Sequence, residues 1–185
     1  MRSVASFSAT GERIGMIIDN GDKHERKIQA KGLDCPPLSG YNHLAIYLRW
    51  AYEKGLLSEK LLKGEPRLKT AMDGECDLRE VIANSKYIKG KIRSSDFTEE
   101  GEAFTRFFYN FSEGIHKYPD YVDQYAKFYY YDKDYSARFK NEAYLFVPYN
   151  EEYYFNLSRY LDVAWNERKS SNSLSGNSQS SRDKV

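Results

Sequence analysis

The sequence lacks a long hydrophobic run. No stretch approaches the roughly eighteen consecutive apolar residues that a membrane-spanning helix needs. Residues 1–8 contain a cation but no apolar run of about seven or more, so they do not resemble a secretory signal. These absences exclude the usual signs of insertion and export, and we expect a soluble, cytoplasmic protein without a membrane partner.

Cysteine and net charge are also scarce. Cys35 and Cys76, the two cysteines, have no metal-binding or redox spacing, as is typical of reduced thiols. The 28 Lys and Arg residues nearly balance 27 Asp and Glu residues, so no overall field would steer a charged partner. Residues 86–93 interleave four cations with apolar residues and could follow a phosphate backbone. In a neutral chain we favour an exposed loop or edge strand there, and we do not expect a nucleic acid partner.

Catalytic signatures are missing as well. The chain contains no G-x-S-x-G elbow, no Gly-rich phosphate loop and no H-E-x-x-H motif. The three histidines, His24, His43 and His116, lack the spacing of metal ligands. Asp120 and Asp123 could act as an acid–base pair, but in the first turn of a predicted helix they simply complement the helix dipole. We therefore expect no catalytic residue, metal or cofactor.

Tyrosine, by contrast, is abundant. The chain has seventeen tyrosines among 185 residues, and thirteen of them lie in residues 109–160. The tyrosine ring is apolar and its tip is polar, so tyrosine suits surfaces that are half in contact with water, such as protein interfaces. This composition favours a binding function.

Hydrophobic patterning predicts a mainly α fold: a single helical domain of about five to six helices, one or two short strands and a disordered C-terminal tail. The length fits one domain. We place an N-terminal arm at residues 1–12, the α-rich domain at 13–169 and a disordered Ser-rich tail at 170–185. The central helix is predicted over residues 41–54, with Ser39 as its N-cap, because apolar residues cover most of its circumference.

The other expected elements are shorter or more peripheral. We predict a helix over residues 59–62, capped by Ser58, and a helix over residues 77–83 with Leu78, Val81 and Ile82 facing inward. A capping box at Asp96 is expected to open a further helix, with Phe104, Phe107, Phe108 and Phe111 in the core. A helix that begins at Tyr118 is expected to have Phe128 on its apolar side, and Asn150 is expected to cap a helix over residues 151–169. Residues 14–18 are expected to form a short strand or ordered arm, residues 143–148 a strand or extended segment, and residues 22–38 a loop.

One face of the central helix carries a candidate pocket. His43, Tyr47 and Trp50 lie on one line of this helix because their spacing is close to whole helical turns. Such a group could line a ligand pocket, with His43 as acid, base or hydrogen-bond donor. The competing interpretation is that His43 is a structural residue with its hydrogen bonds satisfied.

Four motifs, in this order, carry a family resemblance. They are I-D-N-x-x-x-H from Ile18, H-L-A-x-Y-L-x-W from His43, Y-P-x-x-V-D-x-Y-A from Tyr118, and Y-L-F-V-P-Y from Tyr144. Together they resemble a family of uncharacterised bacterial domains associated with toxin-immunity proteins. The resemblance implies an α-rich fold and a role in neutralising a partner toxin, and it implies no catalytic residue. Lys23 stands before His24 where the family carries an aromatic residue, which argues against a role for His24 in a shared pocket.

We therefore expect a non-catalytic immunity-type protein that binds a cognate toxin directly. The expected partner-binding residues lie in loops or off the inward helical faces: Tyr109, Tyr130, Tyr131, Tyr135, Tyr149 and Phe155. The neutral charge argues against mimicry of nucleic acid, which would need a strongly acidic face. The alternative is a small-ligand-binding domain or enzyme with a pocket around His43, Tyr47 and Trp50.

Overall fold

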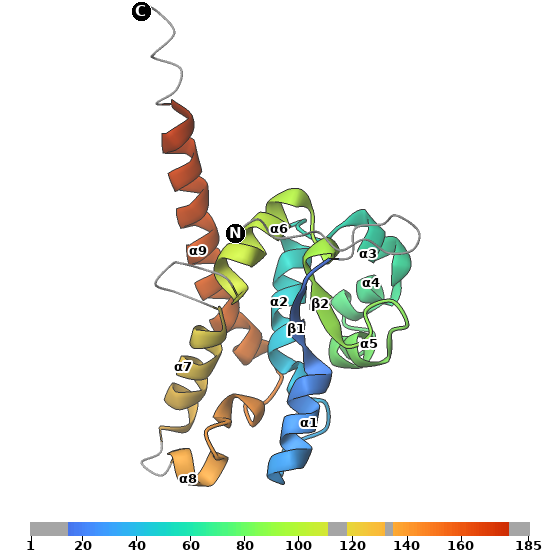
Figure 1. The fold of residues 1–185 in the computed structure, drawn as a ribbon, viewed down its shortest axis with the longest axis vertical. Helices are drawn as coiled ribbons and strands as arrows, with labels where there is room; N and C mark the ends of the chain where they lie inside the picture. Colours follow the sequence, from blue (N-terminus) through green and yellow to red (C-terminus); the bar gives the residue numbers. More distant parts are fainter. Residues whose placement is uncertain (1–14, 111–117, 132–134, 178–185) are drawn as a thin grey trace, which may run out of the picture.

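The computed structural model describes residues 15–110, 118–131 and 135–177 of the chain (Figure 1). This part is mainly α-helical, as predicted, and its two strands form one antiparallel pair. The predicted N-terminal arm, His116 and Phe111 lie outside the described residues. No helix within these ranges is both long and apolar enough to cross a bilayer.

The chain enters the fold through a strand that leads directly into a helix. Strand β1 (Ile17–Asn20) pairs with β2 (Lys91–Arg93), and helix α1 (Gly21–Lys31) follows without a loop. The Asn20 side chain accepts a hydrogen bond from the Asp22 amide at 3.0 Å, so Asn20 is the N-cap.

The predicted loop over residues 22–38 is therefore wrong for the part that α1 occupies. Only Gly21 and Ile28 of α1 are buried, so the helix lacks the apolar stripe on which the prediction depended. Its two ends provide the missing signal. Asn20 caps the start, and Gly32, in the left-handed conformation at φ 55°, ends the helix.

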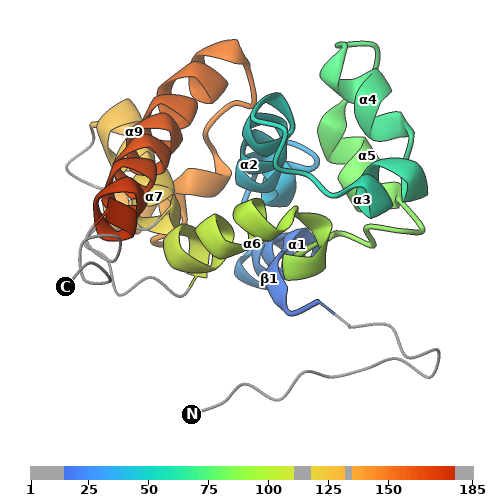
Figure 2. The ribbon, with the colours of Figure 1, turned by 90° about the horizontal axis from the view of Figure 1, so that it is seen from above.

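Helix α2 (Asn42–Glu53) is the centre of the molecule, as predicted. Figure 2 shows it between α7 and α9 on one side and α3 to α5 on the other. Nine of its twelve residues are buried. Asn42 is among them, and its Nδ2 donates to the Val147 carbonyl at 3.0 Å. Ser39 is not the N-cap, because a 3-10 turn (Ser39–Tyr41) precedes the helix.

Three short helices cover one side of α2. They are α3 (Glu59–Gly64), α4 (Arg67–Met72) and α5 (Leu78–Asn84). The predicted cap at Ser58 is confirmed, since its hydroxyl accepts from the Leu61 amide at 3.2 Å. The inward residues predicted for α5, Leu78, Val81 and Ile82, are also buried. Helix α4 was not predicted.

The segment after β2 carries the aromatic core. Helix α6 (Glu99–Thr105) is capped by Thr98 rather than by Asp96, and a π-helical turn (Arg106–Asn110) follows it. Phe104 and Phe108 are buried in the core as predicted, whereas Phe107 is 38% exposed.

The C-terminal half packs two long helices side by side. Helix α7 (Tyr118–Tyr130) is followed by α8 (Tyr135–Phe139), a 3-10 turn (Ala143–Leu145) and α9 (Glu151–Asn177). Asn150 caps α9 as predicted, accepting from the Tyr153 amide at 2.8 Å, and the helix continues past the predicted end at residue 169. The strand predicted over residues 143–148 is wrong. Its backbone closes local turns instead, because no described strand lies beside it to accept a ladder of hydrogen bonds.

Candidate functional site

Asp19 lies where β1 meets α1, and its carboxylate is turned toward the interior. Only 17% of the side chain is exposed. The pairing of β1 with β2 places Asp19 opposite Ile92, and the Gly21 amide donates to the Gly90 carbonyl at 2.9 Å just beyond it. These backbone bonds hold the carboxylate in place.

Two histidines converge on this carboxylate. Nε2 of His24, in the first turns of α1, lies 3.0 Å from Asp19 Oδ1. Nε2 of His43, in the first turn of α2, lies 3.0 Å from Asp19 Oδ2. The two rings meet edge to face with centroids 4.6 Å apart. Because an ionised carboxylate only accepts hydrogen bonds, each histidine donates from Nε2.

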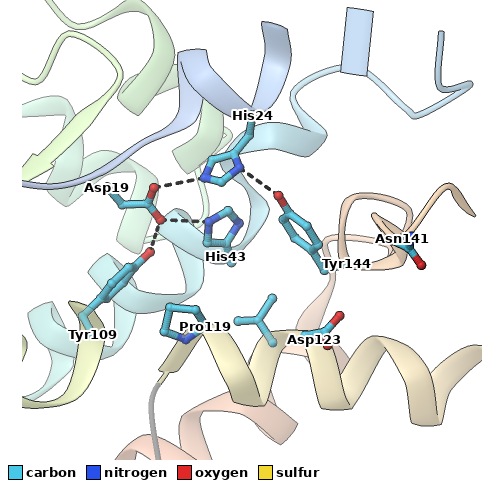
Figure 3. A pocket seen from close by; sticks show the side chains of 9 residues that line it. Asp19, His24, His43, Tyr109, Pro119, Asp123, Asn141 and Tyr144 are labelled. Carbon is cyan, nitrogen blue, oxygen red and sulfur yellow. Dashed lines mark hydrogen bonds and ion pairs between the residues drawn. The ribbon is translucent and has the colours of Figure 1, made fainter. Parts of the chain in front are cut away.

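Two tyrosines extend the network (Figure 3). The Tyr109 hydroxyl donates to Asp19 Oδ2 at 2.5 Å, and the Tyr144 hydroxyl lies 2.9 Å from Nδ1 of His24. When neutral His24 donates from Nε2, its Nδ1 accepts the Tyr144 hydroxyl proton. We call Asp19, His24, His43, Tyr109 and Tyr144 the Asp19 cluster.

The electrostatics of the cluster centre on one negative charge. Burial by itself raises the pKa of Asp19, but hydrogen bonds from His24 and His43 outweigh burial and hold this pKa below its usual range. Burial lowers the pKa of His43, which favours the neutral imidazole despite the contact with Asp19. No described Lys or Arg forms an ion pair with Asp19. Within the described part of the chain, the cluster thus holds a buried carboxylate that is paired with no lysine or arginine.

One polar atom of the cluster is left unsatisfied. Nδ1 of His43 is buried and has no hydrogen-bond partner among the described residues. Buried polar atoms in folded proteins are usually paired, since leaving one unpaired costs about 1–3 kcal/mol. Because neutral His43 donates from Nε2, its Nδ1 is an unused hydrogen-bond acceptor.

A cavity of about 330 Å³ lies beside the cluster. Helix α7 and the segment before the Ala143–Leu145 turn complete its wall, as Figure 3 shows. Its lining residues are Asp19, His24, His43, Tyr109, Pro119, Val122, Asp123, Asn141 and Tyr144. The charged residues among them are the two aspartates, of which Asp123 pairs with Lys127 at 2.6 Å. This volume is in the range of small-molecule sites.

A cavity lies beside His43, but Tyr47 and Trp50, the other two residues of the predicted pocket, do not line it. Both side chains pack in the core. The Tyr47 hydroxyl donates to Thr105 Oγ1 at 2.9 Å, and Trp50 Nε1 donates to Asp162 at 2.9 Å. His43, Tyr47 and Trp50 do lie along one side of α2, as predicted from their spacing. Because α2 is buried on nearly every side, the cavity contacts only the end of this side that carries His43.

The tyrosines predicted to bind a partner have diverse positions. Tyr109 is 1% exposed and belongs to the Asp19 cluster, so it cannot form part of an exposed face. Tyr130 is half-buried and donates to the Phe146 carbonyl at 2.7 Å, and Tyr149 is half-buried beside the Arg79 guanidinium. Tyr131 is 92% exposed. The Tyr135 side chain lies outside the described residues.

Phe155, also predicted to bind a partner, is exposed on α9. Its ring is 60% accessible, and the Arg159 guanidinium lies 5.6 Å from its centroid. Phe128 on α7 is more exposed, at 78%, although its spacing predicts a place on the apolar side of that helix. Exposed aromatic residues therefore occur on both long helices.

Sequence reasoning missed Asp19 and Tyr144 and argued against His24. The available signal was the I-D-N-x-x-x-H motif, in which Asp19 ends a strand and His24 follows in the next helix. Its acidic residue and histidine were too far apart for a metal-ligand pair on one helix. The strand-to-helix junction brings them to 3.0 Å. The replacement of an aromatic residue by Lys23 does not prevent this contact, because the ring of His24 itself contacts Asp19.

Comparison with known families identifies the domain. A family model described as Domain of unknown function (DUF7832) matches residues 17–146. The chain belongs to this family. The matched range contains all five residues of the Asp19 cluster and ends before α9. No curated protein and no solved structure matches the chain.

Proposed function

We propose that this DUF7832 domain binds a small positively charged ligand in the cavity beside Asp19. One observation carries the proposal: a buried carboxylate faces a cavity, and no described Lys or Arg neutralises it. Buried charges in proteins are usually paired or coordinate a metal ion, because an uncompensated charge is costly to remove from water. A cationic ligand would supply the missing charge.

The lining of the cavity supports this choice. Asp19 and Asp123 are its charged residues, and His24, Tyr109 and Tyr144 surround them with groups that can donate or accept hydrogen bonds. Val122 and Pro119 provide an apolar wall on α7. A few convergent polar groups beside an apolar wall are typical of ligand sites. An anion would instead meet the Asp19 carboxylate, which no described lysine or arginine neutralises, so the electrostatics disfavour it.

The test is a binding screen with two kinds of cation. Small organic amines and divalent metal ions are titrated into the protein while the NMR signals of the Val122 methyl groups and the Tyr144 ring are followed. At least one of the two kinds of cation is expected to shift these signals in a saturable way. Asp19→Asn should abolish the response, whereas Asp96→Asn, which alters a buried aspartate away from the cavity, should keep it. If no cation of either kind shifts these signals, the proposal is refuted.

A second function is favoured by a separate observation. Phe128, Tyr131 and Phe155 expose large aromatic rings, which are enriched where proteins bind one another. This observation supports an immunity-type protein that neutralises a cognate bacterial toxin by direct contact, in the cytoplasm and without catalysis. The family resemblance in the sequence motifs points in the same direction.

This second function is tested by co-expression. The chain is produced together with the product of a neighbouring toxin-like gene, and growth and complex formation are measured. Rescue should be lost when Phe128 and Phe155 are both replaced by Ser and retained in Asp19→Asn. If neither a complex nor a rescue of growth is found, direct neutralisation is ruled out.

A further inference from the structure

We propose that Asp19, His24 and His43 form a binding site for one divalent transition-metal ion. This inference rests on the proposed function and specifies it, since it names the cation that the cavity takes. Each of the three residues offers one ligand atom, and these atoms all lie within 4.8 Å of one another. No other group of three or more potential metal ligands of this kind occurs among the described residues.

The distances within the group suit a shared ion. Both Nε2 atoms lie 3.0 Å from oxygens of Asp19. Ligand atoms around a tetrahedral zinc ion are roughly 3.3 Å apart when each lies about 2.0–2.1 Å from the metal. The two distances from histidine to Asp19 are therefore close to the ligand spacing around a shared ion, and all three ligand atoms lie within 4.8 Å of one another.

The chemistry of the ligands selects the class of ion. Two imidazole nitrogens and one carboxylate suit Zn²⁺ and the other divalent ions of the first transition row. Mg²⁺ and Ca²⁺ prefer oxygen ligands and would gain little from the two histidines.

Hydrogen bonds from neighbouring tyrosines fix the orientation of two of the three proposed ligands, as in known metal sites. Ligating histidines usually have a hydrogen-bond partner at the other ring nitrogen, which fixes the ring orientation. The Tyr144 hydroxyl occupies this position for His24 at 2.9 Å. The Tyr109 hydroxyl, at 2.5 Å from Asp19 Oδ2, orients the carboxylate in the same way.

His43 provides a second, independent indication. It lines the cavity, and its buried Nδ1 has no partner among the described residues. A hydrogen-bonded network that served packing alone would be expected to satisfy this atom. When a metal ion binds Nε2 of His43, the proton on Nε2 can move to the unused nitrogen, Nδ1.

Three protein ligands leave coordination positions open. Structural zinc sites usually have four protein ligands, whereas catalytic sites have three and keep a position for water or substrate. The cavity of about 330 Å³ adjoins the three ligands, so the open positions face a space in which a small molecule fits. Tyr109 and Tyr144 line this space and could hydrogen-bond to such a molecule.

The experiment measures metal binding directly. Protein freed of metal with a chelator is titrated with Zn²⁺ by calorimetry and with Co²⁺ by visible absorption, which reports the coordination geometry. One ion per chain is expected, and Mg²⁺ should not bind. His24→Gln should weaken Zn²⁺ binding by more than about 100-fold, and Tyr144→Phe, which removes only an orienting hydroxyl, by about 10-fold.

Three controls separate the possible outcomes. Circular dichroism establishes that each variant is folded, and His24→Gln is the main variant because His24 is partly exposed and is less important for packing than His43. Replacing both Cys35 and Cys76 with Ser should leave binding unchanged and excludes adventitious binding by thiols. Asp96→Asn should also bind normally.

Two results would overturn the metal site: no saturable Co²⁺ spectrum for the folded wild-type protein, or equal Zn²⁺ affinity for the wild type and His24→Gln. If organic amines still bind beside Asp19 in either case, the cation-binding function stands and only the metal inference falls. If neither amines nor metal ions bind, both fall.

Discussion

His43 and Asp19 are 24 residues apart in the chain, yet Nε2 of His43 lies 3.0 Å from Oδ2 of Asp19. Two local features produce this contact. Helix α1 follows β1 without a loop, and the 3-10 turn that opens α2 packs against α1 through Gly21 and Gly40. The contact therefore depends on the junctions between elements, and it places the first turn of the central helix beside the end of a strand.

The hydroxyl of Tyr109 should contribute to stability through its bond to Asp19. Tyr109→Phe removes the donor and leaves the ring packed against Tyr47 and Tyr118. We expect a loss of about 1.5–3 kcal/mol in the free energy of unfolding, measured with urea, because the acceptor is a buried charged group. Tyr131→Phe, on a fully exposed ring, is the matched control and should change stability by less than about 0.5 kcal/mol. Equal effects of the two variants would contradict this role for Tyr109.

The hydrogen bond between Tyr47 and Thr105 should behave as a buried pair in the core. Tyr47→Phe should leave Thr105 without its donor and cost about 1–3 kcal/mol. Combining it with Thr105→Val removes both polar groups, so the double variant should be less destabilised than the sum of the two single variants. Additive effects in urea unfolding would show that the two hydroxyls do not interact.

Asp96 should make the protein less stable as the pH rises. Burial raises the pKa of Asp96 to about 6, although the Arg93 backbone amide and side-chain charges oppose the effect. The folded state therefore holds a proton between about pH 4 and pH 6 that the unfolded state has lost, and stability falls as pH rises through this window. A difference of about two pKa units corresponds to at most about 3 kcal/mol.

Asp96→Asn tests this pH dependence. Its side-chain oxygen can still accept from the Arg93 amide, as Asp96 Oδ2 does at 2.7 Å. The variant should lack the fall in stability between about pH 4 and pH 6, so it should exceed the wild type in free energy of unfolding at pH 7. Parallel curves of stability against pH for the two proteins would show that Asp96 does not titrate in this range.

Gly21 should be needed for the close contact between α1 and the turn before α2. A Cβ atom at this position would overlap the ring of Tyr41. We expect Gly21→Ala to cost about 1–3 kcal/mol in urea unfolding and to shift the NMR signals of the His24 and His43 rings, because the helix that carries His24 must move.

Gly32→Ala is the control for Gly21→Ala. Gly32 has open space around its Cα but adopts φ 55°, so alanine there should cost about 1–2 kcal/mol through backbone strain alone. The ring signals of His24 and His43 should stay unchanged. A shift of these signals in both variants would show that the contact at Tyr41 is not the cause.

Local sequence signals predicted the elements that have strong apolar periodicity and clear caps. Helix α2 was found because apolar residues surround it, α5 through its inward apolar residues, and α9 through its cap at Asn150. Helix α1 was missed because its surface is polar, and the strand over residues 143–148 was wrongly predicted because an aromatic, Pro-ended run fits a strand as well as a buried turn. For α1 the local signal lay in its caps, Asn20 and Gly32, whereas for residues 143–148 the neighbouring elements decided the conformation.

The sequence by itself determined a mainly helical domain with a central helix at α2, because periodicity and capping act over a few residues of the chain. It also placed His43 in a possible pocket. Only the tertiary structure decided which residues join it: Asp19 from β1, His24 from α1, Tyr109 from the turn after α6 and Tyr144 from the turn before α9. These residues come from five separate segments, and a hydrogen bond between them depends on distances of about 3 Å that no local pattern encodes.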